Sequence, residues 1–189
     1  MRIIAGKFRG RPLRSLRGLD LRPTSDRLRE TFFDVLTGGE PERLASTVWL
    51  DLFAGTGAVG IEALSRGAGA VYFVESAKKV AGLIRANLKA LGIATGVEVM
   101  TLDTATALGR LESKGVACDF CFFDPPYRMQ RAYAETLDVL SRSTLLKPAS
   151  VVIAEHEKRF DPGDIFGALA RYRTLKQGDA ALSFYRLSS

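Results

Sequence analysis

The stretch TVWLDLFAGTGAVG, residues 47–60, joins a short apolar run to a glycine-rich turn. The first seven residues are mostly apolar, which is typical of a buried strand. Gly55, Gly57 and Gly60 follow in the spacing G-x-G-x-x-G, and residues 58–67 then have a helical pattern. A glycine loop between a strand and a helix lets a ligand approach the backbone amides at the helix N-terminus. The stretch therefore predicts an α/β fold that binds a nucleotide at this loop.

The alternation of short apolar runs and helical patterns extends along most of the chain. Helices are expected at residues 22–37, 58–67, 76–92 and 131–143. Strands are expected at residues 47–53, 70–75, 97–103, 120–124 and 150–155. Ser25 or Asp26 should cap the first helix and Ser76 the third. Because strands that alternate with helices form βαβ units, the sheet should be mostly parallel. Residues 171–176 and 181–187 are expected to close its edge as an antiparallel hairpin.

An acidic residue ends each of the first four expected strands: Asp51, Glu75, Asp103 and Asp124. Ligands of open α/β sheets bind beyond the carboxyl ends of the strands, so these carboxylates should share one edge. Burying an unpaired carboxylate is costly, and four at equivalent places argue for a polar ligand. Glu75 also lies 20 residues after Gly55, where an acid that binds a ribose is expected.

The fourth acid begins the segment Asp124-Pro125-Pro126-Tyr127. Proline has a fixed φ and no backbone N–H, so two prolines in succession end the strand in a rigid elbow. An ordinary proline turn after a strand would need neither the acid nor the aromatic ring. A dinucleotide site would explain the glycines and Glu75, but it would require neither Asp51 nor this elbow.

Taken in order and spacing, DLFAGTG, Glu75, Asp103 and DPPY resemble the motifs of class I S-adenosylmethionine-dependent methyltransferases. The flanking segments RIIAGKFRGRPL, RPTSDRLRETFFDVL and GIEALSRGA are similar to those of the bacterial 16S ribosomal RNA guanine-N2 methyltransferase family. The resemblance extends over nearly the whole chain. It implies a Rossmann-like fold with a mostly parallel seven-stranded sheet, a C-terminal antiparallel hairpin and a small N-terminal extension.

The resemblance also implies which residues would hold S-adenosylmethionine. Asp51 would orient the methionine part through its ammonium, Glu75 would accept both ribose hydroxyls, and Asp103 would accept the adenine amino group. The cofactor-binding residues expected on this basis are Thr24, Asp51, Phe53, Ala54, Gly55, Thr56, Gly57, Glu75, Ser76, Asp103 and Thr104.

The same resemblance makes the DPPY segment the holder of the methyl-accepting base. The exocyclic amine of guanine is a poor nucleophile because its lone pair is delocalised into the ring. A carboxylate oxygen of Asp124 and the carbonyl of Pro125 would accept its two N–H groups and align the nitrogen. Pro125 and Pro126 would keep the elbow rigid, and Tyr127 would stack on a base that has left its own stack.

The net charge of +6 originates in the N-terminal segment. Residues 1–17 contain six basic residues and no acid, while the remaining 21 basic residues balance 21 acidic ones. Clustered Lys and Arg side chains can neutralise a nucleic-acid backbone, although a merely solvated tail has the same composition. We expect residues 1–21 to form a basic, hairpin-like arm that contacts RNA, and residues 22–189 to form the methyltransferase domain. The RNA-binding residues expected are Arg2, Lys7, Arg9, Arg11, Arg22, Arg27 and Arg128.

The cysteines do not suggest a metal or redox site. Cys118 and Cys121 have C-x-x-C spacing, but the sequence contains one histidine, His156, and a zinc site needs about four ligands. Because residues i and i+3 of a strand point to opposite faces, both should be reduced thiols in or near the core. His156 is expected to be structural or at the surface.

The chain has no run of about 18 apolar residues, so neither a membrane span nor a membrane partner is expected. A cytoplasmic monomer is expected. The resemblance implies that its partner is 16S ribosomal RNA or an assembly intermediate of the small ribosomal subunit. One departure from the family pattern is Gln177, since the last hairpin of the family often has a tyrosine before Gly-Asp.

Three other functions stay open on the sequence alone. A DPPY enzyme could methylate another exocyclic amine, such as adenine N6 or cytosine N4, or a protein glutamine amide. The glycine loop would also suit a nicotinamide dehydrogenase, although no proton-relay residue is evident. A non-catalytic RNA-binding module could use the basic arm, but it would leave the strand-end acids unexplained because carboxylates repel phosphate.

Overall fold

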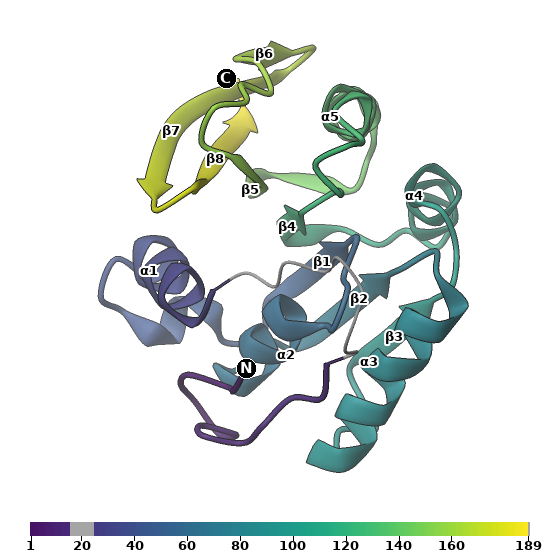
Figure 1. Ribbon diagram of the computed structural model, residues 1–189. Coiled ribbons are helices and arrows are strands. Elements are labelled where there is room, and N and C mark those ends of the chain that lie inside the picture. The colour runs from purple at the N-terminus through teal and green to yellow at the C-terminus, as the bar shows by residue number, and fades with distance from the viewer. Residues whose placement is uncertain (16–24, 189) are drawn as a thin grey trace.

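A computed structural model of the chain describes residues 1–15 and 25–188. Within these ranges the strands form one eight-stranded sheet in the order β3-β2-β1-β4-β5-β8-β7-β6 (Figure 1). The strands are β1 (Val48–Leu52), β2 (Ala70–Val74), β3 (Val97–Met100), β4 (Cys118–Phe123), β5 (Leu146–Glu157), β6 (Ile165–Phe166), β7 (Leu169–Gln177) and β8 (Ala180–Leu187). Strands β1 to β5 are parallel, and β8, β7 and β6 continue the sheet antiparallel. The expected α/β sheet with its C-terminal hairpin is confirmed, and the two-residue β6 extends its edge.

The helices alternate with the strands as expected, but the helix at Thr104–Ser113 was not predicted from the sequence. They are α1 (Asp26–Thr37), the 3-10 turn η1 (Pro41–Leu44), α2 (Ala58–Ser65), α3 (Lys78–Leu91), α4 (Thr104–Ser113) and α5 (Arg131–Arg142). Ser25 caps α1 as expected, because its side chain accepts the Leu28 N–H. The expectation for Ser76 is wrong, since α3 begins after Ala77 and has no side-chain cap. None of the helices in the described ranges has the length and apolar character needed to cross a membrane.

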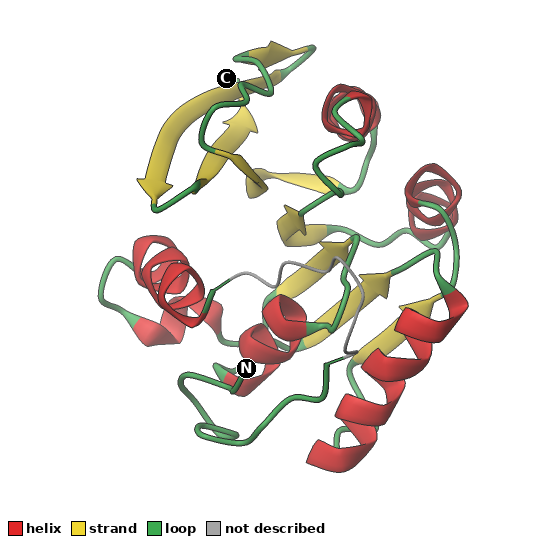
Figure 2. Ribbon diagram, in the orientation of Figure 1, coloured by secondary structure: helices red, strands yellow, loops and turns green. Residues whose placement is uncertain are grey.

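Helices cover both faces of the sheet (Figure 2). One hydrophobic cluster joins the sheet to the N-terminal segment, α1, α2 and α3, and a second joins the opposite face to α4 and α5. Successive strand residues alternate between the two clusters. Trp49 and Phe122 belong to the first cluster, whereas Leu50 and Phe123 belong to the second. This alternation follows from the two-residue period of a strand. Because both faces of the parallel strands are buried, their sequences are continuous apolar runs.

The N-terminal segment folds back on itself and docks on α2. The Ile3 N–H donates to the carbonyl of Arg11 at 3.0 Å. The buried Glu62 carboxylate of α2 then accepts the backbone N–H groups of Ile4 and Ala5 at 2.8 and 2.9 Å. From here on, the arm means residues 1–15, the part of the expected segment 1–21 that the structure describes. The expected hairpin-like turn is present, and its backbone is held against the domain.

Cys118, Cys121 and His156 are all buried in the core. Both cysteines are buried free thiols, but the expectation that they face opposite sides is wrong, because both belong to the cluster under α4 and α5. The physical reason is an irregular register between Cys118 and Phe120, which breaks the two-residue alternation. His156 is also buried, and its Nε2 lies 2.9 Å from the Ser183 hydroxyl.

Candidate active site

The order of the strands brings the glycine loop and the DPPY elbow to neighbouring positions. β2 and β3 extend the sheet on one side of β1, whereas β4 and β5 extend it on the other. Leu52 at the end of β1 pairs with Phe123 at the end of β4. Adjacent strands lie about 4.8 Å apart, so residues 53–57 and 124–127 leave the sheet side by side. In open α/β sheets, ligands bind where the strand order reverses in this way.

The glycines of the loop meet two separate steric requirements. Gly55 and Gly57 have φ values of 53° and 77°, which favour glycine. A Cβ on Gly57 would also lie 3.1 Å from a side-chain carbon of Ile84. A Cβ on Gly60 would lie 2.4 Å from the ring of Phe73, so this glycine allows α2 to pack closely on β2. The loop is therefore built for a tight turn and a close helix.

Asp51 is a buried carboxyl directly beneath this loop. One of its oxygens accepts the backbone N–H of Gly60 at 2.9 Å. Burial raises the pKa of Asp51 to about 7, and the nearby charge of Glu75 acts in the same direction, while the Gly60 hydrogen bond opposes both. An acid with this pKa changes charge near neutral pH, and a cation placed beside it would favour its ionised form.

The next two acids hold their local backbone. Glu75 accepts the N–H groups of Gly55 at 3.1 Å and Ala77 at 2.9 Å, so it ties the glycine loop to the end of β2. Asp103 caps α4 by accepting the Thr106 N–H at 2.9 Å and hydroxyl at 2.7 Å. These hydrogen bonds lower the pKa of Asp103. Each carboxylate oxygen has two lone pairs, so both acids can also accept hydrogen bonds from a ligand.

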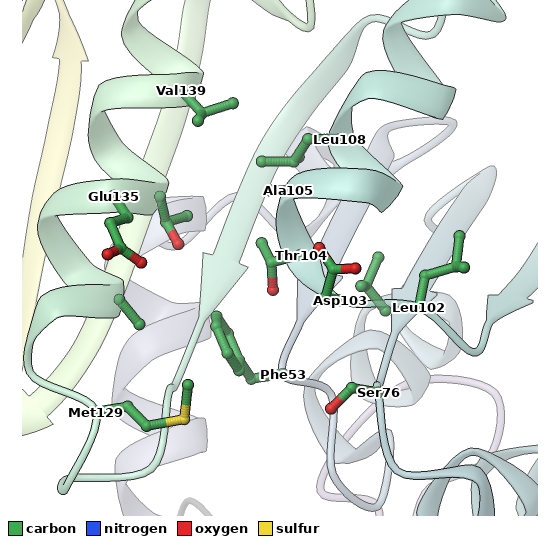
Figure 3. Close-up of a pocket in the computed structure, with 13 residues that line it drawn as sticks. Phe53, Ser76, Leu102, Asp103, Thr104, Ala105, Leu108, Met129, Glu135 and Val139 are labelled. Carbon is green, nitrogen blue, oxygen red and sulfur yellow. The ribbon is translucent and has the colours of Figure 1, made fainter.

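A pocket of about 220 Å³ opens between α4 and α5, next to the loop (Figure 3). Four of the expected site residues line it: Phe53, Ser76, Asp103 and Thr104. Phe53 has a φ of 55°, which is unusual for a residue with a side chain and marks the sharp turn out of β1. The pocket is mainly apolar with a few polar groups at its rim, as is usual for a small-molecule site.

The opposite wall of the pocket was missed by the sequence analysis. It consists of Met129, Ala132, Glu135, Thr136 and Val139, and in Figure 3 the labelled Glu135 and Val139 project from α5. The four α5 residues have the i, i+3, i+4, i+7 spacing of one helix face. That spacing was the available signal, but an ordinary core-facing helix has the same one.

The DPPY elbow lies at the rim of the sheet. Pro125 is buried, Asp124 and Tyr127 are half-buried, and Pro126 is exposed. The turn closes where the Met129 N–H donates to the Pro126 carbonyl at 2.7 Å. The first proline of the elbow is thus buried, while the acid and the ring are partly exposed at the carboxyl end of β4.

The expected RNA-binding residues are spread over three segments. In the described ranges, all are exposed: Arg2, Lys7, Arg9 and Arg11 in the arm, Arg27 in α1 and Arg128 in the elbow. Arg11 also donates to the carbonyl of Ala90 in α3 at 2.8 Å, which fixes the arm to a second helix. Arg22 and the expected cofactor contact Thr24 lie outside the described residues.

Comparisons with known proteins match nearly the whole chain. A family model described as Conserved hypothetical protein 95 matches residues 1–186. Ribosomal RNA small subunit methyltransferase D of Haemophilus influenzae is 36% identical over 159 residues, or 84% of this chain and 79% of that protein. The structure of yhhF from Escherichia coli has a TM-score of 0.82 at 29% identity, over 100% of this chain and 98% of that chain. SMU.776, solved in complex with SAH, covers 82% of this chain and 50% of its own with a TM-score of 0.64, and its 15% identity shows the fold alone.

Proposed function

The chain belongs to the Conserved hypothetical protein 95 family and has the fold of class I S-adenosylmethionine-dependent methyltransferases, and from this premise we propose that it methylates the N2 amine of a guanine in 16S ribosomal RNA. The relative from Haemophilus influenzae is named as a methyltransferase of the ribosomal RNA of the small subunit. The observation that supports the proposal most directly is the pairing of Leu52 with Phe123. That pairing brings the glycine loop beside the elbow, as a methyl transfer between their two ligands requires.

The residues present suit S-adenosylmethionine. The cofactor would supply an electrophilic methyl group on its sulfonium. Asp51 would face the cofactor's ammonium, and that cation would offset the free-energy cost of burying an ionised acid. Glu75 would accept the ribose hydroxyls and Asp103 the adenine amino group. The apolar pocket between α4 and α5 adjoins Asp103 and has room for a flat ring system.

The elbow would hold and align the accepting amine. Asp124 and the Pro125 carbonyl supply two acceptors on one rigid turn, and neither proline has an N–H to compete for them. Two hydrogen bonds from the amine would fix its orientation, which is the main contribution that an enzyme makes to a transfer from an already reactive donor. Tyr127 would stack on the base, and the proton released from the amine would pass to Asp124 or to water.

The arm would bind phosphates of the RNA. Its basic side chains are exposed while its backbone is fixed by Glu62, so binding would require little ordering of the arm. Arg128, adjacent to the elbow, would contact phosphates close to the target base. Binding through several phosphates predicts an affinity that falls steeply as salt rises.

Another exocyclic amine is the second candidate acceptor. The elbow offers two acceptors to an NH₂ group, and adenine N6 and cytosine N4 carry the same group. Mapping of the modified nucleotide in 16S RNA from strains with and without this protein separates the candidates. A guanine that loses its N2 methyl group only in the deletion strain supports the proposal, whereas unchanged guanines and a lost methyl group on adenine or cytosine contradict it.

A further inference from the structure

Tyr133 of α5 contacts the DPPY elbow, the end of β4 and the neighbouring strand β5. Its hydroxyl donates to the backbone carbonyl of Glu155 at 2.9 Å and lies 3.5 Å from the carbonyl of Pro125. Its ring packs against Phe123 and Phe160, with ring centroids 5.9 and 4.9 Å apart. The side chain is 1% exposed. One hydroxyl therefore joins α5, the elbow after β4 and the end of β5.

The prolines explain why a side-chain donor is needed at this place. Phe123 and Ala154 form the last pair between β4 and β5. The next residue of β5, Glu155, therefore lies opposite the elbow. Pro125 has no N–H with which to continue the ladder of hydrogen bonds. At this place the Tyr133 hydroxyl donates to the Glu155 carbonyl, where a residue other than proline could have donated its backbone N–H.

The hydroxyl stays protonated in this position. Burial raises the pKa of Tyr133 far above its ordinary value, and the nearby Asp124 and Tyr127 act in the same direction. The group is therefore a hydrogen-bond donor at neutral pH. The Pro125 carbonyl has two lone pairs, so contact with Tyr133 on one side leaves the other side available to a ligand.

We infer that Tyr133 is a positioning residue, which holds the Pro125 carbonyl and the neighbouring Asp124 in the orientation that accepts the two N–H groups of the substrate amine. The inference rests on the proposed function. Without the hydroxyl, the Glu155 carbonyl would lose this hydrogen bond and the Pro125 carbonyl would lose its polar contact with α5, so the elbow would be held less firmly against β5.

The variant Tyr133→Phe tests this, because phenylalanine keeps the ring packing and removes only the hydroxyl. Tyr185→Phe is the matched control: Tyr185 is also buried in the sheet, and its hydroxyl donates to the carbonyl of Gly163 at 2.8 Å, away from the elbow. We expect kcat for RNA methylation to fall about tenfold in Tyr133→Phe, with the Kd for S-adenosylmethionine unchanged. In Tyr185→Phe, kcat should stay within about twofold of the wild type, on the same principle.

Hydrogen exchange provides a readout that does not depend on activity. The Met129 N–H donates to the Pro126 carbonyl within the elbow, so its exchange reports on the elbow alone. We expect faster exchange of this amide in Tyr133→Phe than in Tyr185→Phe. Equal kcat values, or equal Met129 exchange in the two variants, would overturn the inference. Should the wild type itself methylate no guanine, the proposed function fails, and Met129 exchange alone then decides the role of Tyr133.

Discussion

At the scale of single residues, Asp51 and Asp124 show how position sets the environment of a carboxylate. Asp51 lies in β1 and Asp124 directly follows the neighbouring strand β4, but Asp51 is buried with a pKa near 7, whereas Asp124 is half-buried. A buried acid suits a cation that is buried with it. An acid at the rim suits a base that enters from solvent.

The raised pKa of Asp51 predicts a pH dependence of cofactor binding. Below pH 7 the carboxyl is protonated and cannot pair with the ammonium, so affinity for S-adenosylmethionine should weaken about tenfold per pH unit. Calorimetric titration between pH 5.5 and 8.5 measures this, and Asp51→Asn should bind weakly at every pH. An affinity that is constant over this range in the wild type would contradict the assignment of Asp51 to the ammonium.

The raised pKa of Asp51 also makes the stability of the ligand-free protein depend on pH. Because the folded pKa of Asp51 lies above its unfolded value of 3.8, the folded state binds more protons between pH 4 and 7. As the pH rises through this window, the free energy of unfolding of the ligand-free protein should therefore fall. The contribution of Asp51 alone is up to about 1.4 kcal/mol per pH unit. Urea unfolding of wild type and Asp51→Asn at several pH values isolates this contribution, which should be missing from the variant.

Removal of the Asp124 carboxylate should separate binding from catalysis. In Asp124→Ala we expect kcat to fall at least about 100-fold, because the amine loses one of two aligning acceptors. The Kd for S-adenosylmethionine should change less than about threefold, since the cofactor-facing acids are intact. Single-turnover kinetics and calorimetry measure the two quantities. Turnover within tenfold of the wild type would exclude Asp124 as an aligning residue.

At the scale of elements, the arm is joined to the domain through α2. Lys7 donates its backbone N–H to the Ser65 carbonyl at 2.7 Å, next to the contacts that Glu62 makes with the arm. Gly6 lies in this contact, where a Cβ would be 1.8 Å from the Ser65 carbonyl oxygen. A glycine is therefore required for the arm to dock.

Gly6→Ala should detach the arm, and Gly10→Ala is its control. Both glycines have positive φ, 77° and 82°, so both variants should lose about 1–2 kcal/mol from backbone strain. A Cβ on Gly10 meets nothing within 4 Å, so only Gly6→Ala should also displace the backbone. If the arm binds RNA, KM for RNA rises more in Gly6→Ala than in Gly10→Ala, with cofactor affinity equal. Equal KM values would contradict a role of the arm in RNA binding.

At the scale of the whole molecule, local sequence patterns were sufficient to predict the five parallel strands and the C-terminal hairpin, but not the order of the strands in the sheet. The expected strand at residues 47–53 is observed as Val48–Leu52, and the glycine loop and elbow follow their strands as expected. Parallel strands buried on both faces leave a clear apolar pattern, and prolines or glycines mark their ends.

Features that depend on tertiary contacts were not predictable in the same way. The irregular register beside Cys118 depends on how β4 pairs with β5, so periodicity alone placed the two cysteines wrongly. The α5 wall of the pocket has the spacing of a core face, and the role of Tyr133 depends on a carbonyl 22 positions away in the sequence. Such contacts become apparent only when the elements are packed together.

The most direct test of the account is methyl transfer to defined RNA. The purified protein is incubated with methyl-labelled S-adenosylmethionine and with 16S RNA or 30S subunits from a strain that lacks it, and the RNA is digested to nucleosides. We predict that the label appears in N2-methylguanosine, and that the label is lost in Asp124→Ala. Label in another nucleoside, or no label with an active wild-type preparation that binds the cofactor, would contradict it.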